Sequence, residues 1–462
     1  MMRSTSMLVL AMTCALCLSS CSCSTPPRGR IDGGGGEVDG AVDTGMGTGT
    51  DTGTIVGHDT GPPSPCTGGG GTHVTGTTYA PNGMDPIPGV VVYAVPDSQP
   101  FDPASTTVQC QICGDSAPGA IAFTRAGADG TFDLHSPALD SGGTYTIVTV
   151  SGGFRHVQRH VSVPMCGPLM LPGASTTLPG SSTGDDTVPR IAVAATVGGS
   201  PDVNDKFAHV LDLIGITYDA INPDKGGTPL AAGDDMFAII SDATRLSQYQ
   251  ILVLPCGALG NFTVAPHLTA AMISNLQAWL AMGGRLYASD LAYSVVARTF
   301  PSAVTFATGP SSHAGADDAD VGQGIGSATT LSATVDDAPL LGWLQLVGAV
   351  PAGSSQIPIS DLRDPWGAVD QIPPAALMPD AMGRHHAAVL VSADVTWHTP
   401  GSGHHPLTVQ ADYPNGSGGY CGRVVFTSYH VQTGTGTTLA PQERVLEYLF
   451  FQLSGCIAAG PM

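Results

Sequence analysis

Three residues with reactive or ligand-binding side chains each follow an apolar run that has the composition of a buried strand: Cys256, Asp290 and His430. Because parallel strands end at the same edge of a sheet, we expect these side chains to lie near the crevice where such sheets bind ligands. There Asp290 and His430 would form a hydrogen-bonded pair, orient water, or hold a sugar hydroxyl or a metal. The alternative is that they satisfy backbone groups of their own loops.

The second half of the chain alternates between strand and helix patterns. Short apolar runs at 191–196, 249–255, 285–289 and 422–428 have the composition of buried strands, and residues 268–280 carry apolar side chains at helical spacing. This alternation predicts an α/β domain with a doubly wound, mainly parallel sheet that is covered on both faces.

Residues 189–458 resemble the class I glutamine-amidotransferase-like fold, which is flavodoxin-like, and most closely its trehalose-utilisation-like relatives that lack amidotransferase activity. The resemblance rests on the strand that leads to Cys256, the helix that ends at Gly283-Gly284 and the segment from Gly422 to His430. It leaves residues from about 300 to 410 as an atypical insertion.

The same resemblance implies that the usual chemistry is lost. In that fold the nucleophile is a cysteine on the turn where this chain has Asp290, and the general base is a His followed two residues later by Glu, where this chain has His430 and Gln432. The resemblance therefore implies no amide transfer, and it leaves Asp290, Tyr293 and His430 as ligand-binding candidates. Cys256 is a further candidate: its thiol is either packed or paired, or it is a Cys-His nucleophile.

Residues 73–170 contain short β-branched runs separated by Pro and Gly turns, which predict a β-sandwich. The segments Pro86-Ile-Pro-Gly-Val90, Asp129-Gly-Thr-Phe132 and Tyr145-Thr-Ile-Val148 resemble the carboxypeptidase regulatory-like, transthyretin-like domain. This resemblance implies a scaffold or interaction module without catalysis. A Gly/Ser/Thr/Pro-rich linker is expected at 171–188.

Residues 1–20 have the pattern of a signal peptide: Arg3 precedes about a dozen apolar residues, whereas a membrane-spanning helix needs roughly 20. The ending Leu18-Ser-Ser-Cys21 resembles the bacterial lipobox and implies a lipid anchor on Cys21, as in envelope lipoproteins of delta-proteobacterial type. The alternative is a plain secretory signal with a chance cysteine. Residues 21–72, rich in Gly, Thr and Asp, are expected to be a disordered tether.

Export favours disulfide bonds over zinc or redox roles for the remaining cysteines. The strand at 422–428 and the returning helix from Pro441 place two of them at one sheet edge, so we predict a bridge between Cys421 and Cys456. The disulfide candidates are Cys66, Cys110, Cys113, Cys166, Cys421 and Cys456.

The net charge of −21 argues against a nucleic-acid partner, because phosphate binding needs basic patches. Neither a metal nor a cofactor is predicted: the acidic run at 317–320 and the histidine pairs at 385–386 and 404–405, with His398, are expected to be solvated loops. The sequence therefore predicts a lipid-anchored, non-catalytic binding or assembly module of the cell envelope, on the outer membrane and facing the periplasm or the surface. Its partners would be the membrane and either a glycan or another envelope protein. The alternative is a carbohydrate-active hydrolase or isomerase that uses Asp290 and His430.

Overall fold

The computed structural model describes most of the chain after the predicted tether. The described residues are 64–66, 70–100, 105, 107–113, 117–195, 205–221, 235–256, 268–307, 330–360, 362, 367–381, 383–397, 401–429 and 436–458. The predicted signal peptide, Cys21, nearly all of the predicted tether and His430 lie outside them. In the part of the chain that is described, no helix is long and apolar enough to cross a membrane.

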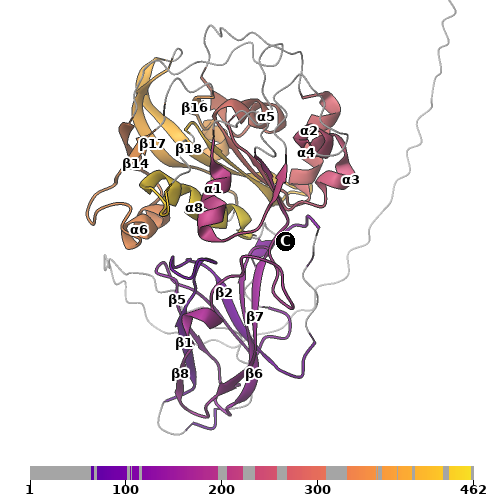
Figure 1. The fold of residues 1–462 in the computed structure, drawn as a ribbon, viewed down its shortest axis with the longest axis vertical. Helices are drawn as coiled ribbons and strands as arrows, with labels where there is room; N and C mark the ends of the chain where they lie inside the picture. Colours follow the sequence, from indigo (N-terminus) through magenta and orange to yellow (C-terminus); the bar gives the residue numbers. More distant parts are fainter. Residues whose placement is uncertain are drawn as a thin grey trace, which may run out of the picture. The chain divides into compact units, whose positions relative to one another are not determined.

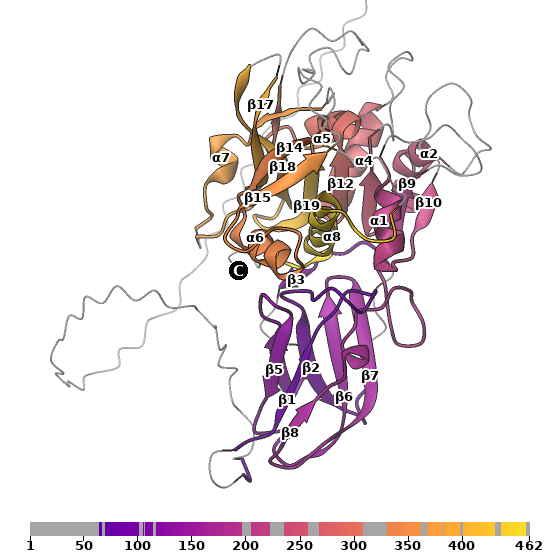
Figure 2. The ribbon, with the colours of Figure 1, turned by 60° about the vertical axis from the view of Figure 1, so that its left-hand side comes forward.

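Apart from β3, the strands from β1 to β8 form two small sheets, which make up the β-rich region of the chain (Figure 2). The first has the order β5 (Thr131–His135), β1 (His73–Thr77), β8 (Pro168–Met170), and the second has the order β4 (Ala122–Arg125), β2 (Val91–Pro96), β6 (Gly143–Ser151), β7 (Phe154–Val163). Val74, Leu134, Val92 and Ile147 are fully buried in a shared apolar cluster. A disulfide between Cys66 and Cys166 joins the two ends of this region.

The turn between β4 and β5 has a local cause. Gly130 adopts φ +76°, which favours glycine, and Asp129 Oδ1 accepts hydrogen bonds from the backbone N–H and the hydroxyl of Thr131. These bonds also lower the pKa of Asp129. Further along, the expected linker at 171–188 contains the short helix η1 (Gly173–Ser175), and Leu178 is buried.

A nine-stranded mixed sheet dominates the rest of the chain (Figure 1). Its order is β10 (Asp219–Ile221), β9 (Ile191–Ala194), β11 (Ile251–Leu254), β12 (Arg285–Ser289), β19 (Tyr420–Thr427), β18 (Ser402–Pro414), β17 (Ala387–Thr396), β14 (Thr330–Val335), β15 (Gln356–Ser360). From β10 to β19 the neighbouring strands run parallel, and every pairing from β19 to β15 is antiparallel.

The prediction of a mainly parallel, doubly wound α/β fold is therefore wrong. Strands take 36% of the structure and helices only 22%, and the large sheet is mixed. The error has a physical source: the stretch set aside as an insertion at about 300–410 supplies β14, β15, β17 and most of β18. These strands extend the same sheet beyond β19, and they pair antiparallel where the prediction had parallel strands.

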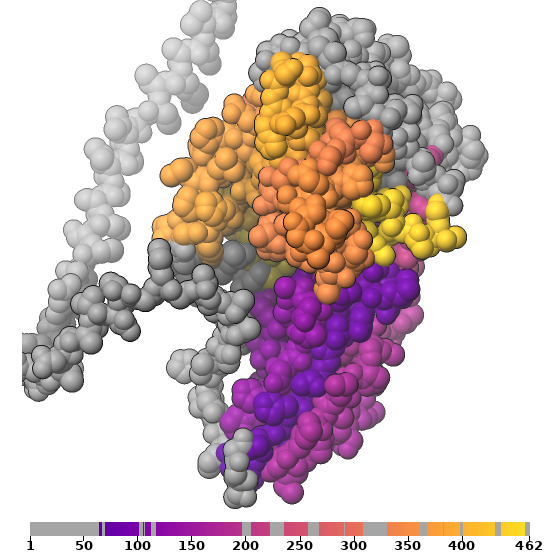
Figure 3. All heavy atoms as spheres, turned by 90° about the vertical axis from the view of Figure 1, so that its left-hand side faces the viewer, coloured from indigo at the N-terminus to yellow at the C-terminus, as the bar shows by residue number. Residues whose placement is uncertain are grey.

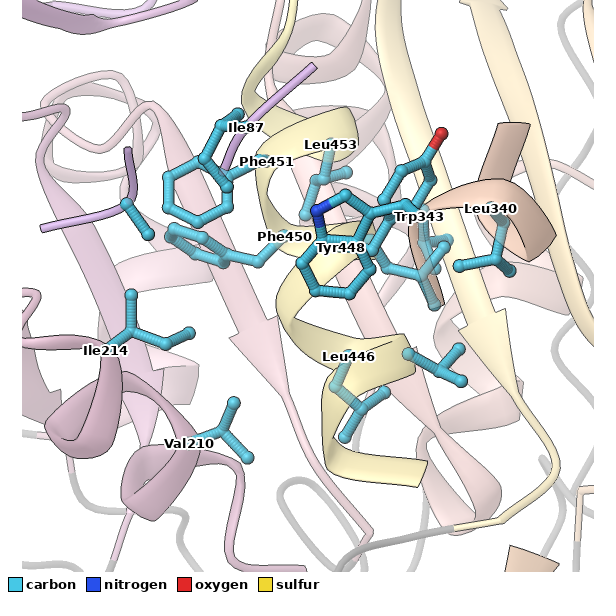
Figure 4. Packing of buried hydrophobic residues seen from close by; sticks show 14 of the residues in the cluster. Ile87, Val210, Ile214, Leu340, Trp343, Leu446, Tyr448, Phe450, Phe451 and Leu453 are labelled. Atoms are coloured by element: carbon cyan, nitrogen blue, oxygen red, sulfur yellow. The ribbon is translucent and has the colours of Figure 1, made fainter. Parts of the chain in front are cut away.

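Helices cover both faces of the parallel part of the sheet. One core contains side chains of α1 (Phe207–Ile214), α6 (Ala338–Leu346) and α8 (Pro441–Ser454), and the other contains side chains of α2 (Met236–Ser241), α4 (Ala270–Ala281) and α5 (Tyr293–Thr299). Figure 4 shows the first core around α8, where Phe450, Phe451 and Leu453 pack close to Ile87 of the β-rich region. Two short helices complete the described set, α3 (Ala243–Leu246) and α7 (Pro374–Leu377).

Two buried arginines bind the carboxyl end of α8. Arg423 Nη1 donates to the carbonyl of Gln452 at 2.7 Å, and Arg285 Nη2 donates to the carbonyl of Gly455 at 3.1 Å. Helix carbonyls at this end lack intrahelical partners and carry partial negative charge, which guanidinium groups satisfy. Burial nonetheless lowers the pKa of Arg285 to about 9, and the charge of Arg423 adds to that effect.

The predicted bridge between Cys421 and Cys456 is wrong, although both residues are disulfide-bonded. Cys421 bonds to Cys110, and their Cα atoms are 4.9 Å apart. The segment that carries Cys110 comes from the β-rich region and follows the amino-terminal edge of the large sheet, where Val108 N donates to the carbonyl of Ser247. Treating the two regions as separate domains hid this pairing, because the bridge joins residues 311 apart in sequence.

Two strand pairs and one short helix remain. β13 (Thr305–Phe306) pairs with β16 (Val369–Gln371), and η2 (Asp290–Ala292) leads into α5. β3 (Ile112–Cys113) pairs with β20 (Ile457–Ala458), so the segment after Cys110 is also held by the backbone that follows α8.

Candidate functional site

The parallel registers bring several strand ends to one edge of the sheet. Leu254 of β11 is opposite Ala288 of β12, and Ser289 is opposite Thr427 of β19. The residues that follow these strands therefore begin at the same level, which places Cys256 beside Asp290. We call Asp205, Cys256, Ser289, Asp290 and Gly367 the strand-end cluster.

Asp290 forms a sharp turn directly after β12. Its φ is +41°, a left-handed conformation that costs a non-glycine residue roughly 1–2 kcal/mol. The residue is only 1% exposed, and its Oδ1 accepts a hydrogen bond from the N–H of Gly367 at 3.0 Å. A Cβ added at Gly367 would lie 2.2 Å from the Asp290 carbonyl oxygen, so only glycine permits this approach.

Cys256 is a buried thiol that contacts the same carboxylate. Its Sγ donates to Asp290 Oδ2 at 3.2 Å, and its backbone N–H donates to Ser289 Oγ at 2.9 Å. Ser289 Oγ in turn donates to Asp205 Oδ2 at 2.5 Å. A neighbouring carboxylate disfavours the thiolate that a nucleophilic cysteine needs, so this arrangement argues against the Cys-His nucleophile.

Tyr287 and Tyr429 lie next to the strand-end cluster, in the core that contains side chains of α1, α6 and α8. The Tyr287 and Thr427 hydroxyls are 2.9 Å apart, and Thr427 Oγ1 donates to the carbonyl of Tyr429. Burial and then the charge of Asp205 raise the pKa of Tyr287 well above its ordinary value. Tyr287 therefore keeps its proton and serves as a hydrogen-bonding group of the fold.

The structure brings the side chains of two of the predicted ligand-binding residues into contact. Asp290 and Cys256 are in contact, whereas Tyr293 begins α5 with 4% exposure and packs its ring 5.4 Å from that of Phe306. His430 lies outside the described residues. Of the described candidates, the strand-end cluster thus brings together one carboxylate and one thiol.

Three members of the strand-end cluster were missed from the sequence. Ser289 directly precedes the predicted turn, and Asp205 follows the first parallel strand. The strand-end argument, applied to every strand, would have named both as candidate site residues. Gly367 belongs to the stretch treated as an insertion, and its role depends on a tertiary contact that no local pattern indicates.

The remaining histidine candidates are in strands or next to them. His385 Nδ1 lies 2.8 Å from the carbonyl of Leu377, and His386 is held between Asp380 and Asp412 at 3.1 and 3.2 Å. His404 and His405 belong to β18. Among the described residues no group of three His, Cys, Asp or Glu side chains is placed to hold a metal ion. The acidic run at 317–320 and His398 lie outside those residues.

Comparison with known proteins gives no family. No protein-family model matches the chain, and no curated protein matches it. Among solved structures, the chain is similar to a cytoplasmic protein of Salmonella typhimurium, STM3548, with 9% identity, a TM-score of 0.31, and coverage of 58% of this chain and 100% of that one. It is also similar to a ThuA-like protein from Parabacteroides merdae, with 14% identity, a TM-score of 0.31, and coverage of 59% and 91%. Such low scores support no statement about activity.

Proposed function

We propose that this protein is a lipid-anchored protein of the cell envelope whose strand-end cluster is non-catalytic and whose folded part is a binding or assembly module. The observation that carries the non-catalytic proposal is the state of Asp290. One carboxylate oxygen accepts the Gly367 N–H and the other accepts the Cys256 S–H, at 1% exposure. A general acid or base needs a proton path to substrate, and a carboxylate that bonds segments of its own chain serves the fold instead.

The anchor and the ligand class rest on the sequence. The lipobox-like ending at Cys21 favours attachment to a membrane, and the disulfides are consistent with an exported protein. A protein held at the envelope faces polysaccharide, which makes a glycan the leading ligand, with another envelope protein as the alternative partner.

The anchor is tested by replacing Cys21 with alanine in the full chain expressed in a bacterium. We expect the native chain to incorporate an alkyne-tagged fatty acid and to sediment with membranes, and the Cys21→Ala chain to do neither. Labelling of the variant at the native level would contradict the anchor.

The function is tested with the full, detergent-solubilised chain on a glycan array, together with an assay for released reducing sugar. We expect saturable binding and no sugar release. Asp290→Asn should weaken binding, because it loosens the edge that the strand ends share, whereas Asp337→Asn at the start of α6 should leave binding unchanged. Sugar release that disappears in Asp290→Asn would instead favour the carbohydrate-active hydrolase or isomerase.

A further inference from the structure

Three side chains on the β17–β18 hairpin form a continuous hydrogen-bonded chain. Ser392 Oγ lies 2.7 Å from His404 Nε2, and His404 Nδ1 lies 2.9 Å from Asp394 Oδ1. The order of atoms matters: one ring nitrogen faces the hydroxyl and the other faces the carboxylate. A base that contacts a nucleophile and is oriented by a third group defines the serine-histidine-aspartate arrangement on any fold.

The hairpin itself positions these groups. Asp394 is directly opposite His404 in the antiparallel register, and Ser392 lies two residues before Asp394 on the same face of the strand. A register shift between Val391 and Ser392 marks a bulge just before the serine, and such bulges re-aim side chains. The arrangement therefore follows from strand pairing.

The surroundings of these three hydrogen-bonded side chains are polar, unlike those of the parallel strands. Thr334 of β14 is directly opposite Ser392, and Gln356 of β15 donates to the Thr334 hydroxyl at 2.9 Å. The other face of these strands carries the buried side chains of Ala333, Val335, Val391 and Ala393. Atoms of the segment from β14 to β18 reach the surface seen in Figure 3.

We propose that Ser392 is an acyl-accepting nucleophile and that the hairpin hydrolyses small acyl esters. Ser392 Oγ attacks the ester carbonyl carbon while His404 Nε2 takes its proton, and His404 then returns that proton to the departing alcohol. Water attacks the acyl-serine, His404 accepts the proton of water, and the carboxylic acid leaves as Ser392 regains its hydrogen. Asp394 is a positioning residue, because it contacts only the imidazole in this scheme.

The burial of the three groups limits the substrate. Ser392 is 3% exposed, whereas the side chains of His404 and Asp394 are 56% and 91% exposed. In this scheme only a slim acyl group could reach the serine, and the alcohol part of the ester would remain on the open side, next to the histidine. In this scheme the Thr334 hydroxyl, whose oxygen accepts from Gln356, would donate its hydrogen to the developing oxyanion. Acetyl esters fit these constraints best.

This activity goes beyond the proposed binding function and uses no residue of the strand-end cluster. Each proposal can therefore fail alone: loss of glycan binding leaves the serine chemistry intact, and an inert serine leaves glycan binding intact.

The test uses the full chain, a fluorophosphonate probe with peptide mass spectrometry, and hydrolysis of p-nitrophenyl acetate compared with the octanoate ester. We expect labelling of Ser392 and preference for the acetate. Ser392→Ala should abolish both, His404→Gln should lower the rate by roughly 10²-fold or more, and Asp394→Asn by roughly tenfold, because a solvated carboxylate interacts weakly. Ser402→Ala, which removes a hydroxyl of the neighbouring strand β18, is the matched control and should change neither.

The outcomes separate catalysis from cross-strand packing. If the folded native chain neither reacts with the probe nor hydrolyses the acetate, the proposal is wrong. Labelling that persists in His404→Gln, or that occurs on another serine, would also overturn it. A melting temperature measured for each variant shows whether a lost signal comes from unfolding, and chemical labelling by the probe in Asp394→Asn keeps the test decisive if His404→Gln does not fold.

Discussion

Asp290 and Glu447 are both buried carboxyl groups, yet their surroundings differ. Asp290 has a donor for each oxygen, from the Gly367 N–H and the Cys256 thiol. Glu447 of α8 is 0% exposed; its Oε2 accepts from Arg444 Nη1 at 2.7 Å, while its Oε1 has no hydrogen-bond partner among the described residues. Asp85 of the β-rich region bonds the same Arg444 nitrogen at 2.6 Å. One guanidinium thus serves two buried carboxyl groups.

The surroundings of Glu447 favour its protonated form. Burial raises the pKa of Glu447 to about 8, the charge of Asp85 adds to the shift, and Arg444 opposes it. The raised pKa favours the protonated form of Glu447 at neutral pH. Asp290 accepts two hydrogen bonds at its edge, whereas the raised pKa of Glu447 makes the junction between α8 and the β-rich region responsive to pH.

The largest expected effect comes from removing the shared cation. Arg444→Met should lower the free energy of unfolding by about 3–5 kcal/mol, because Asp85 keeps a buried charge without its partner. Chemical denaturation of the oxidised protein measures the change. Arg159→Met, which breaks an exposed pair with Asp185, is the matched control and should cost under about 1 kcal/mol. Equal costs for the two variants would refute the difference between buried and exposed pairs.

Glu447→Gln should remove a pH dependence. The pKa of Glu447 rises from an ordinary 4.5 to about 8 on folding, so the folded state holds the proton more tightly. Its contribution to stability is complete below pH 4.5 and is lost as the pH rises through 8, by roughly 3–5 kcal/mol. Denaturation of the native and Glu447→Gln chains from pH 4 to 9 should show the native chain losing stability relative to the variant. If the two stability curves run parallel, the pKa of Glu447 is not raised on folding.

Asp290→Ala should cost about 2–3 kcal/mol, since it leaves the Gly367 N–H without this acceptor and places alanine at φ +41°. Asp290→Asn keeps an acceptor and tolerates that φ, so it should cost about half as much. Thermal melts of both variants at pH 7 measure the difference. A similar loss in both would mean that the charge of Asp290, and not its acceptor oxygen, stabilises the edge.

The sequence predicted four of the five parallel strands, β9, β11, β12 and β19, because each contains an apolar run. It missed β10 (Asp219–Ile221), which is only three residues long and is not an apolar run. It failed for β14 to β18, where strands such as β17 mix apolar and polar residues and depend on neighbours far along the chain. The bridge between Cys110 and Cys421 failed for the same reason: sequence patterns describe local structure, and contacts between regions are decided by packing.

The candidate site shows the same limit. Strand ends placed Cys256 and Asp290 close together without any structure, since the edge of a parallel sheet is a geometric consequence of strand direction. No pattern indicated Gly367 or the hydrogen-bonded chain from Ser392 to His404. Both depend on how distant segments pack and pair. From the sequence, the histidines at 404–405 were predicted to lie in a loop, whereas they belong to β18.

The smallest effect should come from the thiol. Cys256→Ser keeps a donor for Asp290 Oδ2 and should change the free energy of unfolding by under about 1 kcal/mol, whereas Cys256→Ala removes that donor and should cost about 1 kcal/mol more. Denaturation of both variants at pH 7 gives the difference. In the background of Asp290→Ala the two cysteine variants should become equally stable, because the acceptor is gone. A difference that persists there would show that the thiol stabilises this edge through packing and not through Asp290.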